Sequence, residues 1–418
     1  MKLKGIVGEA ATLVSGNVLA QAITLAAYFV LTRIYSPDDY GLFNIFYSYI
    51  EVLIIFSTCK YELAIVVADD DREASAVARF ALRLNALVSM LLLTMALVLW
   101  LSGTLPGNFA QLGWMVLLIP PMVFFSGTSR VYSFLYNRFH RYAQMVLSDN
   151  VNAGAGALMK LLLGLLGFSA SGLPLGTVLG KAVSNLNYRL RLRSLHLPVS
   201  TADDRGKAAS RHRNYPRFVA PKDLVNTFSS NLPFLWAALY FDRAEVGLFG
   251  LALTFTLQPV NILSAAFERV LYARTAEAVR HRLPAMRTLS RFLLLLLAVA
   301  VPVSMLAWFL AEPLFVFCFG ERWQGCGVFV QALLPLALVG LCSTSLMFVS
   351  NVFSTQRIEF IFFLVLMVLR VVAIALGIRE GDFLLTITLY ATAGTLIQAS
   401  LLVWYLWQMR CYERSLTK

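Results

Sequence analysis

Residues 35–46 read YSPDDYGLFNIF, and the tripeptide Gly41-Leu42-Phe43 returns 206 residues later in FDRAEVGLFGLA, residues 241–252. The chain has 418 residues, so the two copies are separated by about half of its length. The same offset, without a gap, places Tyr61-Glu62 on Phe267-Glu268. Two stretches that agree at one offset indicate an internal duplication, in which the chain consists of two equivalent halves.

The composition is typical of a membrane protein. Hydrophobic residues make up 59% of the chain and charged residues 14%, and the mean hydropathy is +0.71. A soluble chain of this length needs far more charge to stay in solution. The apolar runs are continuous, which excludes a barrel of alternating strands. We therefore expect an all-α polytopic membrane protein, and we do not interpret the net charge of +12 as a nucleic-acid signal.

Apolar runs and basic loops predict the topology. A bilayer core of about 30 Å is crossed by roughly 20 apolar residues in a helix. One side of the predicted topology carries 25 Lys and Arg residues in its loops and tails, whereas the other carries four. Basic loops face the cytoplasm, so both termini are expected there. The twelve predicted spans are 10–32, 41–67, 80–101, 114–135, 146–168, 172–188, 224–241, 246–272, 291–311, 327–352, 358–378 and 383–408.

A long polar segment near the middle of the chain predicts the domain boundary. Residues 189–222 carry nine Lys and Arg residues and read as a solvated cytoplasmic linker, with contact to anionic lipid headgroups as the alternative. The predicted domains are a six-helix bundle over 1–200, a basic linker over 201–222 and a second six-helix bundle over 223–418. Both bundles start on the same side, so a pseudo-two-fold axis along the membrane normal should relate them.

Polar side chains recur at helical spacing inside several predicted spans. A charge at mid-membrane is costly, so such residues usually face a cavity or a partner. Packing between helices can explain any one stripe. Stripes in both halves are better explained by a water-accessible central cavity. Candidate cationic substrate-binding residues are Arg130, Lys160, Arg269, Lys181, Arg370 and Lys60, and candidate polar lining residues are Asn17, Gln21, Gln258, Asn261 and Asn152.

Acidic residues also occur in or near the predicted spans. The candidates for coupling transport to H+ or Na+ are Glu51, Glu62, Glu268 and Asp149. Three residues lie near the cytoplasmic face, namely Lys60, Glu62 and Asp149, and snorkelling toward the interface is expected for them. The excess of basic groups inside the spans suits an anionic cargo, such as a pyrophosphate-linked lipid, held by charge-assisted hydrogen bonds.

Glycine recurs at every fourth position from Gly172 to Gly180 in the predicted span 172–188. This spacing places Gly172, Gly176 and Gly180 on one helix face. Small residues at such a face allow another helix to approach closely. The sequence therefore predicts a tight helix contact along this face.

Motifs for catalysis are missing from the sequence. Residues 176–182, GTVLGKA, lack the spacing of a phosphate-binding loop and lie in a predicted span. The four histidines fall in predicted cytoplasmic loops, and no metal-binding motif occurs. We therefore expect a protein that is not an enzyme and holds no resident cofactor.

Four segments resemble one family of membrane proteins. Residues 12–43 and 60–74 resemble the start of Wzx-type polysaccharide flippases, and residues 245–278 and 319–340 resemble later parts of that family. The most specific match is the pattern L-T-R-x-Y-[ST]-P-[DE]-D-[FY]-G, which residues 31–41 satisfy. The resemblance covers most of the chain in collinear order.

This resemblance implies the multidrug/oligosaccharidyl-lipid/polysaccharide (MOP) transporter superfamily, with two MATE-like six-helix bundles in a V around a central cavity. It implies a flippase, acting by alternating access, that moves an undecaprenyl-pyrophosphate-linked oligosaccharide to the periplasmic leaflet of the bacterial inner membrane. The implied partners are this polyprenyl-linked oligosaccharide and membrane lipids, with a polysaccharide polymerase and a chain-length regulator as further candidates. The implied functional state is a monomer.

Three alternatives remain open at the level of sequence. A multidrug or small-metabolite exporter would share the fold, but an acidic or aromatic cavity is expected for it. A membrane-embedded polysaccharide polymerase should have a long outer loop with catalytic Arg or His, which this sequence lacks. A scaffold without transport activity would leave the polar stripes unexplained.

Overall fold

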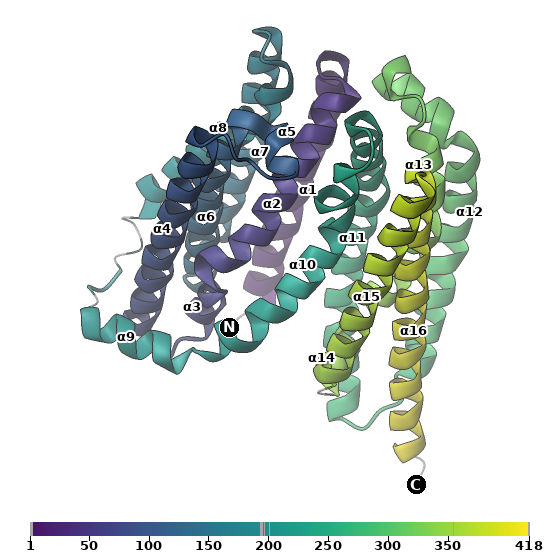
Figure 1. Ribbon diagram of the computed structural model, residues 1–418. Helices are drawn as coiled ribbons and strands as arrows, with labels where there is room; N and C mark the ends of the chain where they lie inside the picture. Colours follow the sequence, from purple (N-terminus) through teal and green to yellow (C-terminus); the bar gives the residue numbers. More distant parts are fainter. Residues whose placement is uncertain (1–2, 193–194, 196, 200, 354, 417–418) are drawn as a thin grey trace. The chain divides into compact units, whose positions relative to one another are not determined.

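The computed structural model describes residues 3–192, 195, 197–199, 201–353 and 355–416. These residues form helices and connecting turns without a strand (Figure 1), so the predicted all-α class is confirmed. The helices are α1 (Leu3–Ile34), α2 (Pro37–Thr58), α3 (Ala64–Val67), α4 (Asp71–Leu101), α5 (Asn108–Leu112), α6 (Ile119–Arg138), α7 (Tyr142–Leu165), α8 (Ser169–Leu192), α9 (Ala202–Arg211), α10 (Ala220–Leu235), α11 (Arg243–Arg280), α12 (Met286–Phe319), α13 (Cys326–Ser345), α14 (Phe348–Val352), α15 (Gln356–Glu380) and α16 (Phe383–Leu416).

The long helices overlap the predicted spans, although the predicted span 41–67 is wrong as one continuous helix, because the chain breaks between α2 and α3. Eight helical segments in the described part of the chain are long and apolar enough to cross a membrane, and they include α2, α4, α6, α11, α12, α13, α15 and α16. The helices at the other predicted spans are α1, α7, α8 and α10, which are not among these eight. The protein is therefore a multi-pass membrane protein, and the total of twelve spans stays a prediction.

The chain folds into two compact units, residues 1–228 and residues 229–418. Helices α1 to α9 belong to the first unit and α11 to α16 to the second, while α10 runs across the boundary. The domain limits drawn from the sequence, at 1–200, 201–222 and 223–418, stay a prediction. Each unit is described separately below.

The repeated motif begins a long helix in each unit. Ser36 caps α2 and accepts a hydrogen bond from the backbone N–H of Asp39 at 3.2 Å. At the same offset of 206 residues, Asp242 caps α11 and accepts from the N–H of Ala244 at 3.4 Å. Asp39 and Glu245 both follow three residues after the cap, where the helix N-terminus stabilises negative charge. The shared capping pattern supports the predicted duplication.

The two helices that begin with the repeated motif, α2 and α11, differ in how far they continue. Cys59 and Lys60 adopt left-handed backbone conformations with φ of 47° and 63°, and a short 3-10 turn, η1 (Tyr61–Leu63), follows. In the second unit α11 continues without interruption to Arg280. A left-handed conformation costs a non-glycine residue about 1–2 kcal/mol. The α2 break, which we define as residues 59–63, therefore depends on contacts that hold it.

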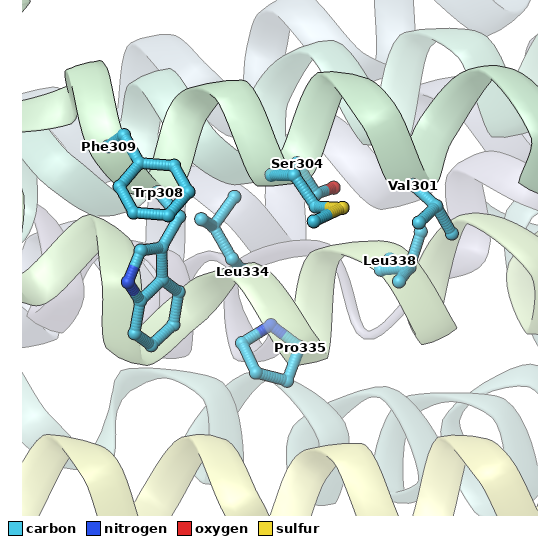
Figure 2. A pocket seen from close by; sticks show the side chains of 8 residues that line it. Val301, Ser304, Trp308, Phe309, Leu334, Pro335 and Leu338 are labelled. Carbon is cyan, nitrogen blue, oxygen red and sulfur yellow. The ribbon is translucent and has the colours of Figure 1, made fainter.

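In the second unit, α12 and α13 border an open apolar hollow of about 360 Å³. Trp308 and Phe309 of α12 and Pro335 of α13 lie on its walls (Figure 2). Phe309 is 73% exposed and Phe317, further along α12, is 82% exposed, as expected for a helix that faces lipid. A phosphate or sugar group would lose its hydrogen bonds in such a lining. The hollow therefore suits a hydrocarbon chain and not a charged headgroup.

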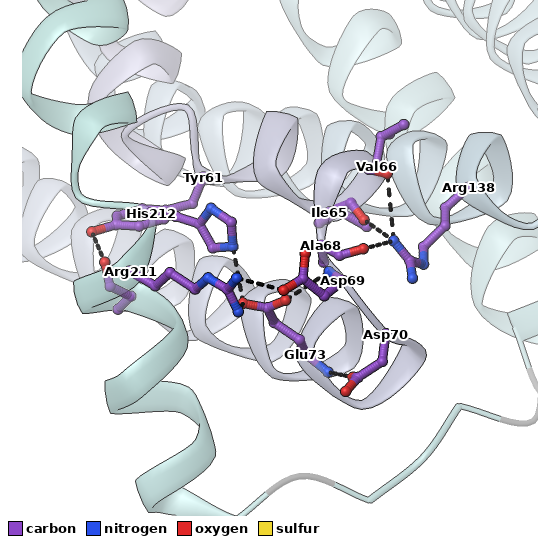
Figure 3. A network of polar contacts seen from close by, with 11 residues as sticks. Tyr61, Ile65, Val66, Ala68, Asp69, Asp70, Glu73, Arg138, Arg211 and His212 are labelled. Atoms are coloured by element: carbon purple, nitrogen blue, oxygen red, sulfur yellow. Dashed lines mark hydrogen bonds and ion pairs between the residues drawn. The ribbon is translucent and has the colours of Figure 1, made fainter.

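A side chain from α6 stabilises the segment that follows the break. The guanidinium of Arg138 donates to the backbone carbonyls of Ile65, Val66 and Ala68 at 3.0, 3.4 and 2.8 Å (Figure 3). It also binds Asp71 Oδ1 at 3.1 Å. The last carbonyls of a helix have no partner within the helix, and Arg138 supplies one for α3. The broken chain between α2 and α4 is thus fixed to α6.

Helices α7 and α8 pack closely along the predicted glycine face. A Cβ on Gly180 would lie 2.5 Å from the Cα of Gly156, so backbone meets backbone at this position. A Cβ on Gly176 would lie 2.6 Å from the Lys160 side chain. Gly172, the third glycine of the face, lies against the side chain of Tyr35. The close approach that the glycine spacing predicts is confirmed.

The basic segment after α8 folds against the first unit. Thr201 and Asp204 form a capping box that begins α9. At the other end of α9, Arg211 pairs with Asp69 and donates to Glu73 Oε1 at 3.2 Å (Figure 3). Most residues of α9 stay exposed while the helix docks on the first unit, and the solvated linker stays a prediction. Acidic residues at the start of α4 supply the partners, and these residues lie far away in the sequence.

The capping box predicts how α9 responds to acid. Hydrogen bonds from Thr201, aided by Arg72, lower the pKa of Asp204 from 3.8 to about 2. Because the folded pKa lies below the unfolded one, Asp204 contributes stability above about pH 4 and loses it as the pH falls through about 2. We expect a spin label at Lys207→Cys to be less mobile at pH 5, where α9 is capped, than at pH 2. In Asp204→Asn the label should be more mobile at neutral pH, and equal mobility of the two proteins across this range would contradict the prediction.

Candidate functional site

Charged side chains from several helices meet inside the first unit. Arg130 of α6 lies 4.0 Å from Glu62 of the α2 break. The side chain of Glu62 is 2% exposed and that of Arg130 is 40% exposed. Tyr47 of α2 lies within electrostatic range of both Arg130 and Glu51. The expected snorkelling of Glu62 is therefore wrong, because its carboxylate is buried against Arg130.

The same group of charges extends to α7 and α8. Lys181 of α8 lies within electrostatic range of Arg130 and Asp149. Asp149 of α7 accepts a hydrogen bond from the Tyr188 hydroxyl at 3.4 Å. We call four of the predicted residues the Arg130 cluster, and its members are Glu62, Arg130, Asp149 and Lys181, whereas Glu51 is exposed.

The Arg130 cluster combines acids with bases. The buried carboxylate of Glu62 lies 4.0 Å from the guanidinium of Arg130, and the Arg130 side chain keeps accessible surface. A guanidinium that is only partly occupied by a carboxylate has donors left for an incoming oxyanion. The cluster is therefore chemically suited to exchange an internal carboxylate for an anionic ligand.

Lys160 lies on α7, three helical turns beyond Asp149. Its amine lies 4.9 Å from the centre of the Phe43 ring, and its backbone carbonyl accepts from the Tyr35 hydroxyl at 2.7 Å. Among the described residues, no carboxylate is within ion-pair distance of this amine. An ammonium against an aromatic face is stabilised by about 0.5–2 kcal/mol, less than a buried charge requires. Lys160 is thus a second cation that is available to an anion.

Other predicted residues of the first unit lie outside the cluster. Lys60 forms an ion pair of 2.6 Å with Asp223 of α10, so it acts at the α2 break, and its snorkelling toward the interface stays a prediction. Gln21 on α1 and Asn152 on α7 are half-buried. The side chain of Asn17 lies outside the described residues.

In the second unit, Arg370 of α15 is buried, with 7% of its surface exposed. Its guanidinium lies 4.1 Å from the centre of the Tyr390 ring and donates to Ser229 Oγ at 3.3 Å. Its Nε finds no hydrogen-bond partner within the described residues. Arg370 therefore connects α10, α15 and α16 through neutral groups.

The remaining candidates of the second unit are spread along α11. Gln258 is half-buried and Asn261 is exposed. Glu268 is half-buried and lies within electrostatic range of Tyr405 on α16. The side chain of Arg269 lies outside the described residues. The described contacts do not join these residues into one site.

The sequence analysis missed a buried carboxylate, Glu359 of α15. It is 2% exposed and accepts hydrogen bonds from the Tyr405 hydroxyl at 2.9 Å and from Ser350 Oγ at 3.0 Å. A signal was present nonetheless, because Glu359, Leu366 and Arg370 recur at helical spacing on one buried face.

Comparisons with known proteins agree with this architecture. The family model described as polysaccharide biosynthesis protein matches residues 30–328. An inward-facing multidrug resistance MATE transporter of the MOP superfamily has a TM-score of 0.72 and 13% identity, covering 94% of this chain and 96% of that chain. The lipid II flippase MurJ, in an inward closed conformation, has a TM-score of 0.72 and 11% identity, covering 96% and 91%.

A Vibrio cholerae MATE transporter has a TM-score of 0.58 and 11% identity, covering 98% of this chain and 97% of that chain. No curated protein sequence matches. At these identities the solved structures show the fold alone. The family model covers well over half of the chain, and the resemblance found in the sequence is confirmed at this level. The chain belongs to the polysaccharide biosynthesis protein family and has the fold of MOP-superfamily transporters.

Proposed function

We propose that the protein is a flippase for an undecaprenyl-pyrophosphate-linked oligosaccharide, which it moves from the cytoplasmic to the periplasmic leaflet of the bacterial inner membrane by alternating access. Family membership supports a role in polysaccharide biosynthesis. The fold shared with a lipid II flippase supports a lipid-linked cargo. The basic loops support cytoplasmic termini.

The observation that carries the proposal is the Arg130 cluster. Charged groups inside a membrane bundle are energetically costly, and those that are present usually mark a functional site. Arg130 keeps two-fifths of its side-chain surface accessible, and it offers the planar donor pair that binds phosphate oxygens at two points. In the proposed cycle the cargo pyrophosphate displaces Glu62 from Arg130, and Lys181 and Lys160 contribute further positive charge.

The carboxylates of the cluster supply a means of coupling to H+ or Na+. When Glu62 is released from Arg130 by the cargo, a proton or a sodium ion neutralises it. Glu51 and Glu268 are further candidates for this role. Transport that keeps its pH dependence in Glu51→Gln and Glu268→Gln would remove these two residues from the coupling scheme. A polysaccharide polymerase and a chain-length regulator are the proposed protein partners.

The proposed function is tested by deleting the gene in its native bacterium. Lipid-linked repeat units should accumulate in the inner leaflet, and surface polysaccharide should be restored when the protein is supplied again. The matched control supplies Arg130→Leu at equal membrane abundance. Outer-leaflet glycolipid that appears at the normal rate in the deletion strain, with no second flippase present, would reject the proposal.

The second candidate function is multidrug export, which the similarity to a multidrug resistance MATE transporter favours. The deletion strain decides between the two. A drug exporter predicts higher sensitivity to cationic dyes with unchanged surface polysaccharide. The flippase predicts unchanged sensitivity to cationic dyes and reduced surface polysaccharide.

A further inference from the structure

The segment from residue 198 to residue 224, here called the linker, surrounds the α2 break. At its start the carbonyl of Pro198 accepts hydrogen bonds from Ser75 Oγ at 2.7 Å and from Arg79 at 3.0 Å. Ala220 and Leu224 at its other end pack against Ile54 and Ile55 near the end of α2. The linker therefore contacts the helices on both sides of the break.

Two residues of the break itself are bound by the linker. The Tyr61 hydroxyl donates to the carbonyl of Ala209 in α9 at 3.2 Å (Figure 3). Lys60 pairs with Asp223 in α10 at 2.6 Å. Both contacts are made by neighbours of Glu62, the residue whose carboxylate faces Arg130.

Ion pairs hold α9 in place on the start of α4. Arg211 binds Asp69 and Glu73, and His212 lies 3.3 Å from Glu73 (Figure 3). The Arg211–Asp69 pair is exposed and individually weak, whereas Ala208 of α9 is 4% exposed and packs into the core of the first unit. The linker is therefore a docked element, and Arg211 supplies the weak, exposed part of its attachment.

We propose that the linker positions Glu62 against Arg130, and that release of α9 changes the state of the Arg130 cluster. Tyr61, Lys60 and Arg211 are positioning residues in this scheme, because each acts through the backbone of the break. The chain passes from the linker into the second unit within α10, so a movement of that helix reaches Glu62 through Asp223 and Lys60. This proposal rests on the proposed function for its biological meaning.

The first test does not depend on the cargo. Cys59 lies in the break and is half-buried, so its reaction with a water-soluble maleimide reports on the conformation of the break. The test uses the full-length protein with Cys318, Cys326, Cys342 and Cys411 replaced by serine or alanine. Arg211→Gln should raise the labelling rate of Cys59 about fivefold, as expected when weak ion pairs no longer oppose a local opening.

Lys207→Gln is the matched control, because Lys207 lies on the same helix and pairs with Asp203 of α9 itself. It should leave the labelling rate unchanged. Equal rates for Arg211→Gln and Lys207→Gln would overturn the proposal.

The second test asks whether the linker acts through Glu62. Arg211→Gln should reduce surface polysaccharide in the complemented deletion strain, and it should cause no further reduction in a Glu62→Gln background. Effects that simply add would show that the linker acts elsewhere. If surface polysaccharide never depends on the protein, the proposed function fails, whereas the labelling of Cys59 still decides the present proposal.

Discussion

Arg130→Leu is expected to reduce surface polysaccharide by about 10-fold or more, because it removes the two-point contact to phosphate oxygens, and hydrogen bonds to charged groups contribute roughly 1.5–3 kcal/mol. The same change leaves the carboxylate of Glu62 buried without its cation, so the thermal unfolding midpoint should also fall. The measurements are surface polysaccharide in the complemented deletion strain and unfolding of the purified protein in detergent.

A second substitution separates the loss of function from the loss of stability. Arg130→Leu combined with Glu62→Leu removes both charges, and replacing a buried pair by apolar residues is often neutral or stabilising. The double variant should therefore unfold near the wild-type temperature and still fail in transport. Arg130→Lys should keep partial activity, because it retains the charge and loses the two-point contact. A double variant that transports normally would show that the Arg130 cluster only stabilises the bundle.

Substitution of Gly180 is expected to have the largest effect on folding. Its Cβ would meet the backbone of Gly156 at 2.5 Å, and a backbone atom cannot move aside as a flexible side chain can. Overpacking of this kind costs typically about 1–3 kcal/mol. Gly180→Ala should therefore lower the thermal unfolding midpoint, and Gly180→Leu should leave little folded protein in the membrane.

Gly154 on α7 provides the matched control. A Cβ at this position has no neighbour within 4 Å, so Gly154→Ala introduces the same methyl group into open space. Alanine is also the better helix former by about 1 kcal/mol, and the variant should be as stable as the wild type or slightly more stable. If Gly180→Ala and Gly154→Ala unfold at the same temperature, the close packing of α7 on α8 is not needed for stability.

Several features followed directly from the sequence. Continuous apolar runs predict the helices, because a buried backbone in lipid must satisfy its own hydrogen bonds. The spacing of Gly172, Gly176 and Gly180 predicts the tight contact of α8, since it depends only on the helical period. The repeat around Gly41 marks capped N-termini in both units, because capping is chemistry between residues that are near in the sequence.

The partners of the charged residues followed only from the tertiary structure. The sequence places Glu62 and Arg130 in different spans, and their pairing across 68 positions has no local signal. The same applies to Lys60 with Asp223, whose ion pair fixes the α2 break. The buried position of Glu359 was missed for a similar reason, since its hydroxyl partners come from other helices.

The segment 189–222 shows this division most clearly. Its composition correctly indicates a basic and polar stretch, and Thr201 with Asp204 even carries the local signal of a helix start. Whether α9 is solvated or docked depends on Asp69 and Glu73, which belong to the start of α4. Hydropathy and capping act within a few residues of the chain, whereas the partner of a charge is chosen by the fold. The sequence by itself therefore predicted the apolar membrane helices, and the tertiary structure decided which charges meet.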